Sequence, residues 1–278
     1  MIRPNISVII PLYNKAKSIH RTIESLQKQT FQRFEIVIVN DGSTDNSVEI
    51  VNRIDDDRIR LINQDNAGPG AARNTGVKNA QAEWIVFLDA DDELLPDALE
   101  YFYSIIQTHE DVDIIDCNKY NRIGHTLQLG YHPIEGYVKN PLKECFFGNI
   151  GPGEGHSAFR RSLMLKYSYD ERIRRFEDAE LLIRLLNDSI VYSTIKPTMI
   201  VNCEYSEASS PRKNVYEDYF AYLDFETGGF WRKMCVYRTF LEERILYPEY
   251  GRKQYKKMYY RYDLLLCHKL LNYLKRYI

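Results

Sequence analysis

The stretch Phe34-Glu-Ile-Val-Ile-Val-Asn-Asp-Gly-Ser-Thr-Asp45 joins an apolar run to a polar turn. Residues 34–39 are rich in β-branched side chains, and a short apolar run of this kind predicts a buried strand. A turn at residues 40–43 follows, and Ser43 or Thr44 is predicted to cap a helix that begins just after it. The inward positions of that helix are Val48, Val51 and Ile54. A strand, a turn and a helix in this order are the repeating unit of an α/β fold.

The same alternation extends along the chain on both sides of this unit. Strands are predicted at residues 6–10, 59–62, 84–88 and 112–117, and helices at about 19–26, 70–80, 96–109 and 177–186. This order predicts a Rossmann-like, mostly parallel sheet with helices on both faces. Residues 120–160 contain seven glycines and are predicted to form irregular loops. Ligands of such sheets bind beyond the carboxyl ends of the strands.

Composition excludes several classes of protein. The chain has 278 residues, of which 44% are apolar and 27% charged, and its formal net charge is −2. That balance is typical of a globular protein and argues against a nucleic-acid binder that works through global charge. No apolar run approaches the roughly 18 residues of a membrane span, and a strand predicted from residue 6 leaves no room for a signal peptide. Five widely spaced cysteines argue against a disulfide framework or a zinc site, so we expect a cytoplasmic protein.

The C-terminal part differs in composition from the rest of the chain. Residues 252–278 hold eight Lys or Arg and one Asp, and 14 of the 22 tyrosines lie in the last third of the sequence. We predict a boundary at 206–211 between a main domain over 1–205 and a helical, basic and aromatic extension over 206–278. A basic face beside an aromatic and leucine face predicts that 252–278 contacts an anionic membrane surface or a lipid-linked acceptor. The alternative is that its apolar face packs on residues 212–246 or on a second copy of the chain, as a homo-oligomer.

Three predicted strands end in segments that can bind a ligand, at residues 11–13, 40–43 and 89–92. The carboxyl ends of parallel strands lie at one edge of a sheet, so these segments should converge. In the last of them Asp89, Asp91 and Asp92 would repel one another unless a cation or a set of donors is present. Two carboxylates on a divalent ion can hold a nucleotide diphosphate. The alternative is that Asp92 caps the next helix and the other acids are solvated.

Three further residues have both a functional and a structural interpretation. Arg73, on the first turn of a predicted helix, can reach a phosphate or lie on the surface. Asp41 can accept a hydrogen bond from a base or a ribose, or act as a plain turn residue. Asp178 opens a helix and becomes a general-base candidate only if it lies at the site; otherwise it interacts with the helix dipole. A Rossmann glycine motif after the first strand and a P-loop are both missing from the sequence, which argues against those nucleotide sites.

Seven segments of the sequence together resemble a known family. They are Ser7-Val-Ile-Ile-Pro-Leu-Tyr-Asn14, Gln29-Thr-Phe31, Glu35-Ile-Val-Ile-Val-Asn-Asp-Gly-Ser-Thr-Asp45, Gln64-Asp-Asn-Ala-Gly68, Ala72-Arg-Asn74, Phe87-Leu-Asp-Ala-Asp-Asp92 and Phe176-Glu-Asp178. In that order and spacing they resemble the family 2 inverting glycosyltransferases with the GT-A fold, over about residues 5–200. The resemblance implies a nucleotide-binding half at 1–119 and an acceptor half at 120–205.

The resemblance also implies roles for individual residues. Those around the nucleotide would be Pro11, Tyr13, Asp41, Asn66 and Arg73, with Asp41 reading the base. Asp89 would contact the ribose or assist the metal, and Asp91 would bind Mn²⁺ or Mg²⁺ on the diphosphate. Asp178, the second residue of the Glu177-Asp178 pair, would be the catalytic base. Family members often carry a Trp-rich segment where this chain has Gly155-His156, which we predict to line the acceptor site.

The combined interpretation is a metal-dependent inverting glycosyltransferase. It would move a sugar from a nucleotide diphosphate sugar, with UDP as the expected nucleotide, to a hydroxyl group of a saccharide or lipid-linked acceptor in cell-surface polysaccharide or glycolipid assembly. We expect it in the cytoplasm, in peripheral contact with the inner face of the plasma membrane, and with no nucleic-acid partner. Two alternatives stay open: a nucleotidyltransferase, for which Lys15 and Lys17 are the candidate triphosphate ligands, and a non-catalytic nucleotide-sugar-binding subunit.

Overall fold

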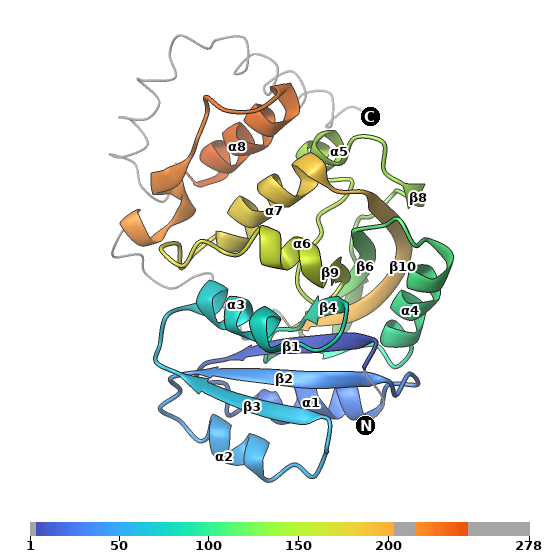
Figure 1. Ribbon diagram of the computed structural model, residues 1–278, viewed down its shortest axis with the longest axis vertical. Coiled ribbons are helices and arrows are strands. Elements are labelled where there is room, and N and C mark those ends of the chain that lie inside the picture. The colour runs from blue at the N-terminus through green and yellow to red at the C-terminus, as the bar shows by residue number, and fades with distance from the viewer. Residues whose placement is uncertain (1–3, 203–214, 244–278) are drawn as a thin grey trace.

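The computed structural model describes residues 4–202 and 215–243, and in this part of the chain ten strands form one sheet. Its order is β3-β2-β1-β4-β9-β6-β10-β5, with β7 paired to β6 and β8 paired to β10. The strands are β1 (Ile6–Leu12), β2 (Phe34–Asp41), β3 (Ile59–Gln64), β4 (Trp84–Phe87), β5 (Glu93–Leu94), β6 (Ile114–Ile123), β7 (Thr126–Leu129), β8 (Gly136–Tyr137), β9 (Ser157–Arg160) and β10 (Val191–Asn202). The helices are α1 (Ile19–Gln27), α2 (Ser47–Asn52), α3 (Pro69–Asn79), α4 (Ala98–Thr108), α5 (Pro141–Phe147), α6 (Arg161–Lys166), α7 (Glu177–Asp188) and α8 (Phe230–Glu243), with short 3-10 turns η3 (Val215–Glu217) and η4 (Tyr219–Tyr222). Helices flank the sheet on both faces (Figure 1), as predicted.

The N-terminal half is a parallel sheet made of the strands that the sequence predicts. β1 pairs in parallel with β2 and with β4, and β2 pairs in parallel with β3. Side chains of a strand alternate between its two faces. Val8 and Ile10 pack in a cluster with residues of α1 and α4, whereas Ile9 and Phe87 pack in a second cluster with residues of α3. Burial on both faces explains why these strands are continuous apolar runs in the sequence.

The prediction of irregular loops over residues 120–160 is wrong. This region contains β7, β8, α5 and β9, and β9 runs antiparallel between β4 and β6. The strand predicted at 112–117 is β6, which begins at Ile114 and continues to Ile123. Strands of two to four residues are too short to show a hydrophobic period, so their pattern cannot be told from that of a loop.

The predicted cap of α2 is also wrong. The helix begins at Ser47, and the carboxylate of Asp45 accepts a hydrogen bond from the Ser47 backbone N–H at 3.0 Å. The hydroxyl of Ser43 instead donates to the carbonyl oxygen of Leu12 at 3.4 Å. This contact ties the turn after β2 to the end of β1, two strand ends at which the sequence predicts ligand binding.

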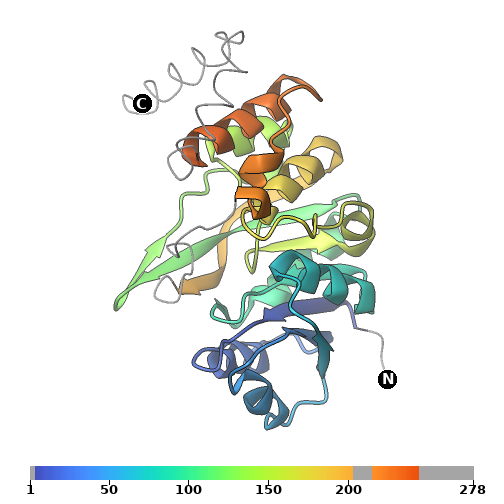
Figure 2. The ribbon, with the colours of Figure 1, turned by 90° about the vertical axis from the view of Figure 1, so that its left-hand side faces the viewer.

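Part of the predicted C-terminal extension packs on the main core. α8 contacts α5 and α7, and η4 contacts α7 and α8. Figure 2 shows α8 (orange) over α7 and α5, on the side away from the blue N-terminal strands. Buried Tyr219 and Val236 belong to the same core cluster as Leu181 of α7. Residues 215–243 are therefore continuous with the main core, whereas the predicted boundary at 206–211 and the predicted helix at 252–278 lie outside the described residues. Within the described ranges no helix combines the length and the apolar character that a membrane span needs.

Candidate active site

A cleft of about 720 Å³ opens at the carboxyl ends of β1, β2 and β4, within the size range of small-molecule sites. It brings together every residue predicted for the nucleotide, the metal and the base. These are Pro11, Tyr13, Asp41, Asn66, Arg73, Asp89, Asp91, Glu177 and Asp178. The loop before α7 adds Arg174, Arg175 and Phe176. The strand ends converge because the strands are parallel, and α7 brings its first turn to the same place from the other half of the chain.

Asp41 organises the loop that follows β3. Its carboxylate accepts hydrogen bonds from the side-chain amide of Gln64 at 2.7 Å and from the backbone N–H groups of Ala67 and Gly68, both at 2.9 Å. A carboxylate can accept about four hydrogen bonds, so these three leave room for one more, although only 3% of the residue is exposed. Tyr13 lies 43% exposed at the same cleft and offers an aromatic face. The pair suits a flat heterocycle that stacks on an aromatic ring and donates an N–H group.

Arg73 is the buried centre of a cluster of acids, and the alternative of a surface arginine is wrong. Only 5% of the residue is exposed, and its guanidinium nitrogens lie 2.9 Å from Asp89 Oδ1, 3.4 Å from Glu154 Oε1 and 2.8 Å from Glu177 Oε1. Burial opposes its charge, but Glu154 and Asp89 raise the pKa of Arg73 well above its ordinary value. Arg73 therefore links the acid run after β4 to the first turn of α7. The predicted phosphate contact stays a prediction.

The three aspartates that follow β4 differ in their burial and in their contacts. Asp89, Asp91 and Asp92 all line the cleft, and Asp91 Oδ2 lies 2.8 Å from the ammonium of Lys15. Asp92 is 7% exposed and accepts a hydrogen bond from the backbone N–H of Asn202 at 2.8 Å, so it binds β10 and does not cap α4. Burial, assisted by the charge of Asp89, raises the pKa of Asp92 to about 7.

Asp89 and Asp91 are the residues that could hold a divalent ion. Carboxylate oxygens suit Mg²⁺ and Mn²⁺. Each of the two already has a cationic side chain within 2.9 Å, so the site accommodates positive charge beside both. In the described part of the chain no group of three or more His, Cys, Asp or Glu side chains is placed to hold an ion by itself. Oxygens of a bound phosphate or of water would have to complete the coordination.

The first turn of α7 presents two carboxylates in opposite environments. Glu177 is 7% exposed and turned toward Arg73, and burial raises its pKa to about 7. Asp178 is exposed at the cleft, where its Oδ1 accepts the Ala179 backbone N–H at 2.8 Å. The preceding residue, Phe176, has φ 55°, a left-handed conformation that costs a residue with a side chain about 1–2 kcal/mol. Backbone strain of this kind is commonly retained where a loop must position functional groups. An exposed carboxylate on a buried, anchored helix start can accept a proton from a bound molecule.

Glu154 is a cleft residue that the sequence analysis missed. It lies between Gly153 and Gly155, lines the cleft, and forms part of the acid cluster around Arg73. A single acid between two glycines carries no local pattern, because its function depends on contacts with β4 and α3. Only its place in a glycine-rich loop could have drawn attention to it.

The structure does not place Gly155 or His156 among the residues that line the cleft. The predicted acceptor lining stays a prediction. Gly155 has φ +74°, and a Cβ there would lie 2.5 Å from the side chain of Met199. Its N–H donates to the carbonyl oxygen of Phe87. The ring of His156 is 5% exposed, and its nitrogens lie 2.9 Å from the carbonyl oxygens of Glu154 and Gly151. Burial lowers the pKa of His156 to about 3, so the neutral ring holds the loop from beneath.

Asp116→Asn is expected to remove part of the pH dependence of stability. Asp116 is fully buried beneath this loop and accepts hydrogen bonds from Ser157 Oγ at 3.0 Å and from the Gly151 N–H at 3.2 Å. Burial raises its pKa to about 7, whereas an unfolded Asp has a pKa of about 3.9. Between these values the folded state binds more protons than the unfolded state, so the free energy of unfolding falls as the pH rises through about 7.

The measurement is urea unfolding at pH 5 and pH 8 of the wild type and of Asp116→Asn, which keeps an acceptor oxygen. The wild type should lose more stability than the variant over this interval. Asp92 and Glu177 contribute to the pH dependence equally in both proteins. The difference between the wild type and the variant in the stability lost from pH 5 to pH 8 is therefore the contribution of Asp116. Equal losses would contradict the assignment.

The protein family and the relatives that this chain matches are all described as glycosyltransferases. The profile described as Glycosyl transferase family 2 matches residues 7–168, more than half of the chain. The uncharacterized glycosyltransferase YibD of Escherichia coli (strain K12) is 44% identical over 115 residues, which are 41% of this chain and 33% of YibD. Glycosyltransferase GlyG of Streptococcus pneumoniae serotype 4 is 40% identical over 119 residues, which are 42% of this chain and 39% of GlyG. The matched segment thus spans well under half the length of either relative.

Among solved structures, S. aureus TarS 1–349 in complex with UDP-GlcNAc has a TM-score of 0.67 with 23% sequence identity. The alignment covers 76% of this chain and 62% of that one. At this identity the likeness concerns the fold alone. It confirms the predicted fold class, a GT-A-like sheet flanked by helices.

Proposed function

Because this chain belongs to glycosyl transferase family 2, we propose that it transfers a sugar from a nucleotide diphosphate sugar to a hydroxyl acceptor, with inversion and with the help of a divalent ion. One observation carries the proposal. The acids after β4 and the exposed carboxylate of Asp178 line a single cleft, although they lie in different halves of the chain. A site for a charged leaving group and a site for a base therefore face the same space. A glycosidase would instead need two opposed carboxylates, one of which acts as an acid.

Different residues of the cleft would perform different parts of the reaction. Tyr13 and Asp41 would hold the base, and Asp89 and Asp91 the metal and the diphosphate. Asp178 would take the proton of the acceptor hydroxyl as that oxygen attacks the anomeric carbon from the face opposite the diphosphate. One attack with one base inverts the anomeric configuration. Glu177 is buried against Arg73, so it would position Asp178 instead of exchanging protons with substrate.

A divalent ion, Mn²⁺ or Mg²⁺, would neutralise the diphosphate leaving group and make a general acid unnecessary. Asp91 now lies against the Lys15 ammonium, and Asp89 against Arg73. A divalent ion at these carboxylates would compete with the two cationic side chains, so we propose that Lys15 moves from Asp91 to the diphosphate when the ion binds. The same contacts argue against the nucleotidyltransferase alternative. Lys15 is paired with Asp91, an acid of the cleft, and Lys17 does not line the cleft.

UDP is the nucleotide that we propose for the donor. TarS, which shares the fold, is found in complex with UDP and with UDP-GlcNAc. We further propose a saccharide or lipid-linked acceptor, a function in cell-surface polysaccharide or glycolipid assembly, and a cytoplasmic location at the membrane. The peripheral contact would involve residues 252–278, which lie outside the described residues.

The proposal predicts that UDP and UDP-sugars bind well with Mn²⁺ and weakly in EDTA. Lys15 and Arg73 offset only part of the negative charge of the acids at the end of β4, so without a divalent ion these acids repel a diphosphate. A thermal-shift screen of nucleotide sugars should therefore identify a donor, which at a concentration of about 100 Kd adds about 2.7 kcal/mol to the free energy of unfolding. Calorimetry then compares the wild type with Asp91→Asn. We expect the variant to lose the benefit of Mn²⁺, while Asp97→Asn, an acid outside the cleft, keeps it. Equal affinity in EDTA and in Mn²⁺ would reject the metal site.

A further inference from the structure

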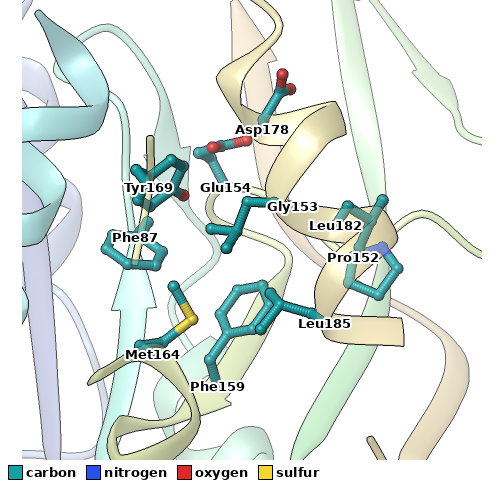
Figure 3. Close-up of a pocket in the computed structure, with 11 residues that line it drawn as sticks. Phe87, Pro152, Gly153, Glu154, Phe159, Met164, Tyr169, Asp178, Leu182 and Leu185 are labelled. Carbon is teal, nitrogen blue, oxygen red and sulfur yellow. The ribbon is translucent and has the colours of Figure 1, made fainter. Parts of the chain in front are cut away.

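A second, smaller pocket lies beside the cleft and shares Glu154 and Asp178 with it. Its volume is about 20 Å³. It is lined by Phe87, Pro152, Gly153, Glu154, Phe159, Met164, Tyr169, Asp178, Leu181, Leu182 and Leu185. Figure 3 shows the two acids at one end of the pocket and Met164, Phe159 and Leu185 at the other. The pocket therefore runs from the candidate base into apolar packing between β9, α6 and α7.

The inner walls of this pocket are apolar and closely packed. Phe87 lies edge-on to Tyr169 with ring centroids 5.8 Å apart, and its centroid is 5.9 Å from that of Phe159. These rings, together with Met164 and Leu185, are at most 5% exposed. A space of this volume holds one water-sized group, and an apolar lining disfavours water because it offers too few hydrogen-bond partners. A methyl group has the matching size and polarity.

The mouth of the pocket has the opposite character. Glu154 and Asp178 are carboxylates, and ionised carboxylates only accept hydrogen bonds. Glu154 Oε1 lies 3.4 Å from Arg73 Nη2, so the side chain is held in place by a buried cation. A group that satisfies both ends must carry an N–H or O–H donor next to a methyl-sized apolar end. In sugars the acetamido group of an N-acetylhexosamine has this combination, whereas a hydroxyl group has no part that fills the apolar end.

We propose that this pocket is the subsite for the acetamido group of an N-acetylhexosamine, with the methyl inside and the N–H donated to Glu154. The inference rests on the proposed function, because it places a sugar beside Asp178. That sugar can be the donor or the acceptor, since both would meet at the base. The chemistry recognised is the same in either case.

The test compares two pairs of substrates that differ only in this group. UDP-GlcNAc and UDP-glucose are compared as donors by UDP release, and the methyl β-glycosides of GlcNAc and glucose as acceptors, with the donor found in the thermal-shift screen. We expect the acetamido member of one pair to have at least about a tenfold higher kcat/KM, the typical discrimination for one well-packed apolar group. A preference in the donor pair assigns the subsite to the donor, and a preference in the acceptor pair assigns it to the acceptor. Equal kcat/KM in both pairs, with transfer still measurable, overturns the subsite alone. If no nucleotide sugar is bound or used, the proposed function fails and this inference fails with it.

Substitutions in the wall of the pocket test whether this pocket causes the preference for the acetamido substrate. Leu182 is half-buried on α7, so Leu182→Phe should fill the pocket without unfolding the protein. The ratio of kcat/KM for the acetamido substrate to kcat/KM for the hydroxyl substrate should then fall close to one. Leu165→Phe, at a 48% exposed position on α6 outside the pocket, is the matched control and should keep the wild-type preference. Leu182→Ala should widen the pocket and raise the use of the N-propanoyl analogue relative to the N-acetyl substrate. A preference that neither Leu182 variant changes would overturn the assignment.

Discussion

Asp178→Asn is expected to lower the rate of sugar transfer by about 10²–10⁴-fold, the contribution of a positioned general base. The amide keeps the size of the side chain and can still accept the Ala179 N–H, but it cannot take the proton of an acceptor hydroxyl. The residues that we assign to the nucleotide lie on other elements, so its affinity should stay close to that of the wild type. Single-turnover transfer and calorimetry of UDP binding with Mn²⁺ measure the two quantities separately.

The matched control is Asp188→Asn, at the other end of the same helix. Asp188 accepts a hydrogen bond from the hydroxyl of Tyr167, which an amide oxygen can also accept, and it does not line the cleft. Its transfer rate should equal that of the wild type. Turnover of Asp178→Asn above a tenth of the wild-type rate would show that another group is the base.

Arg73→Met is expected to lower the free energy of unfolding by about 3–5 kcal/mol, the effect of removing one partner from a buried ion pair. The change leaves Glu154 and Glu177 close together with no cation between them, and Glu177 is buried. Urea unfolding at pH 8, where the carboxylates are most fully ionised, gives the largest difference. At lower pH the loss should shrink, because Glu177, whose pKa is about 7 even beside Arg73, then takes up a proton.

Two further variants separate the charge effect from lost packing. Arg53→Met removes an arginine whose side chain is 75% exposed in its pair with Glu49, and should change stability by less than about 1 kcal/mol. Combining Arg73→Met with Glu177→Gln should recover part of the loss, since the two residues are in contact and their effects do not add. A loss of under about 1 kcal/mol for Arg73→Met would mean that water already reaches the acid cluster.

The elements of the N-terminal half could be predicted from the sequence because their signals are local. Residues of β1 and β2 are buried on both faces, so each strand is a continuous apolar run, and Ile19, Ile23 and Leu26 lie on one face of α1. The convergence of the cleft residues at strand ends followed from the same pattern, whereas the family resemblance pointed to Asn66, Arg73 and Asp178. Parallel strands end at one edge, so Tyr13, Asp41 and Asp89 had to converge whatever their individual functions.

The sequence by itself therefore determined the α/β class, the strand ends that line the cleft, and the family resemblance that pointed to Asp178. The tertiary structure decided what depends on partners distant in the chain. Arg73 contacts Glu177, 104 residues away, and this contact makes it a buried link and not a surface arginine. β9 is a strand because β4 and β6 lie on either side of it, and its position buries His156 and brings Glu154 to the cleft. A hydrophobic period records only which face of an element is buried. Which elements meet there is set by packing over the whole fold, and that is where the acid cluster and the small apolar pocket beside it arise.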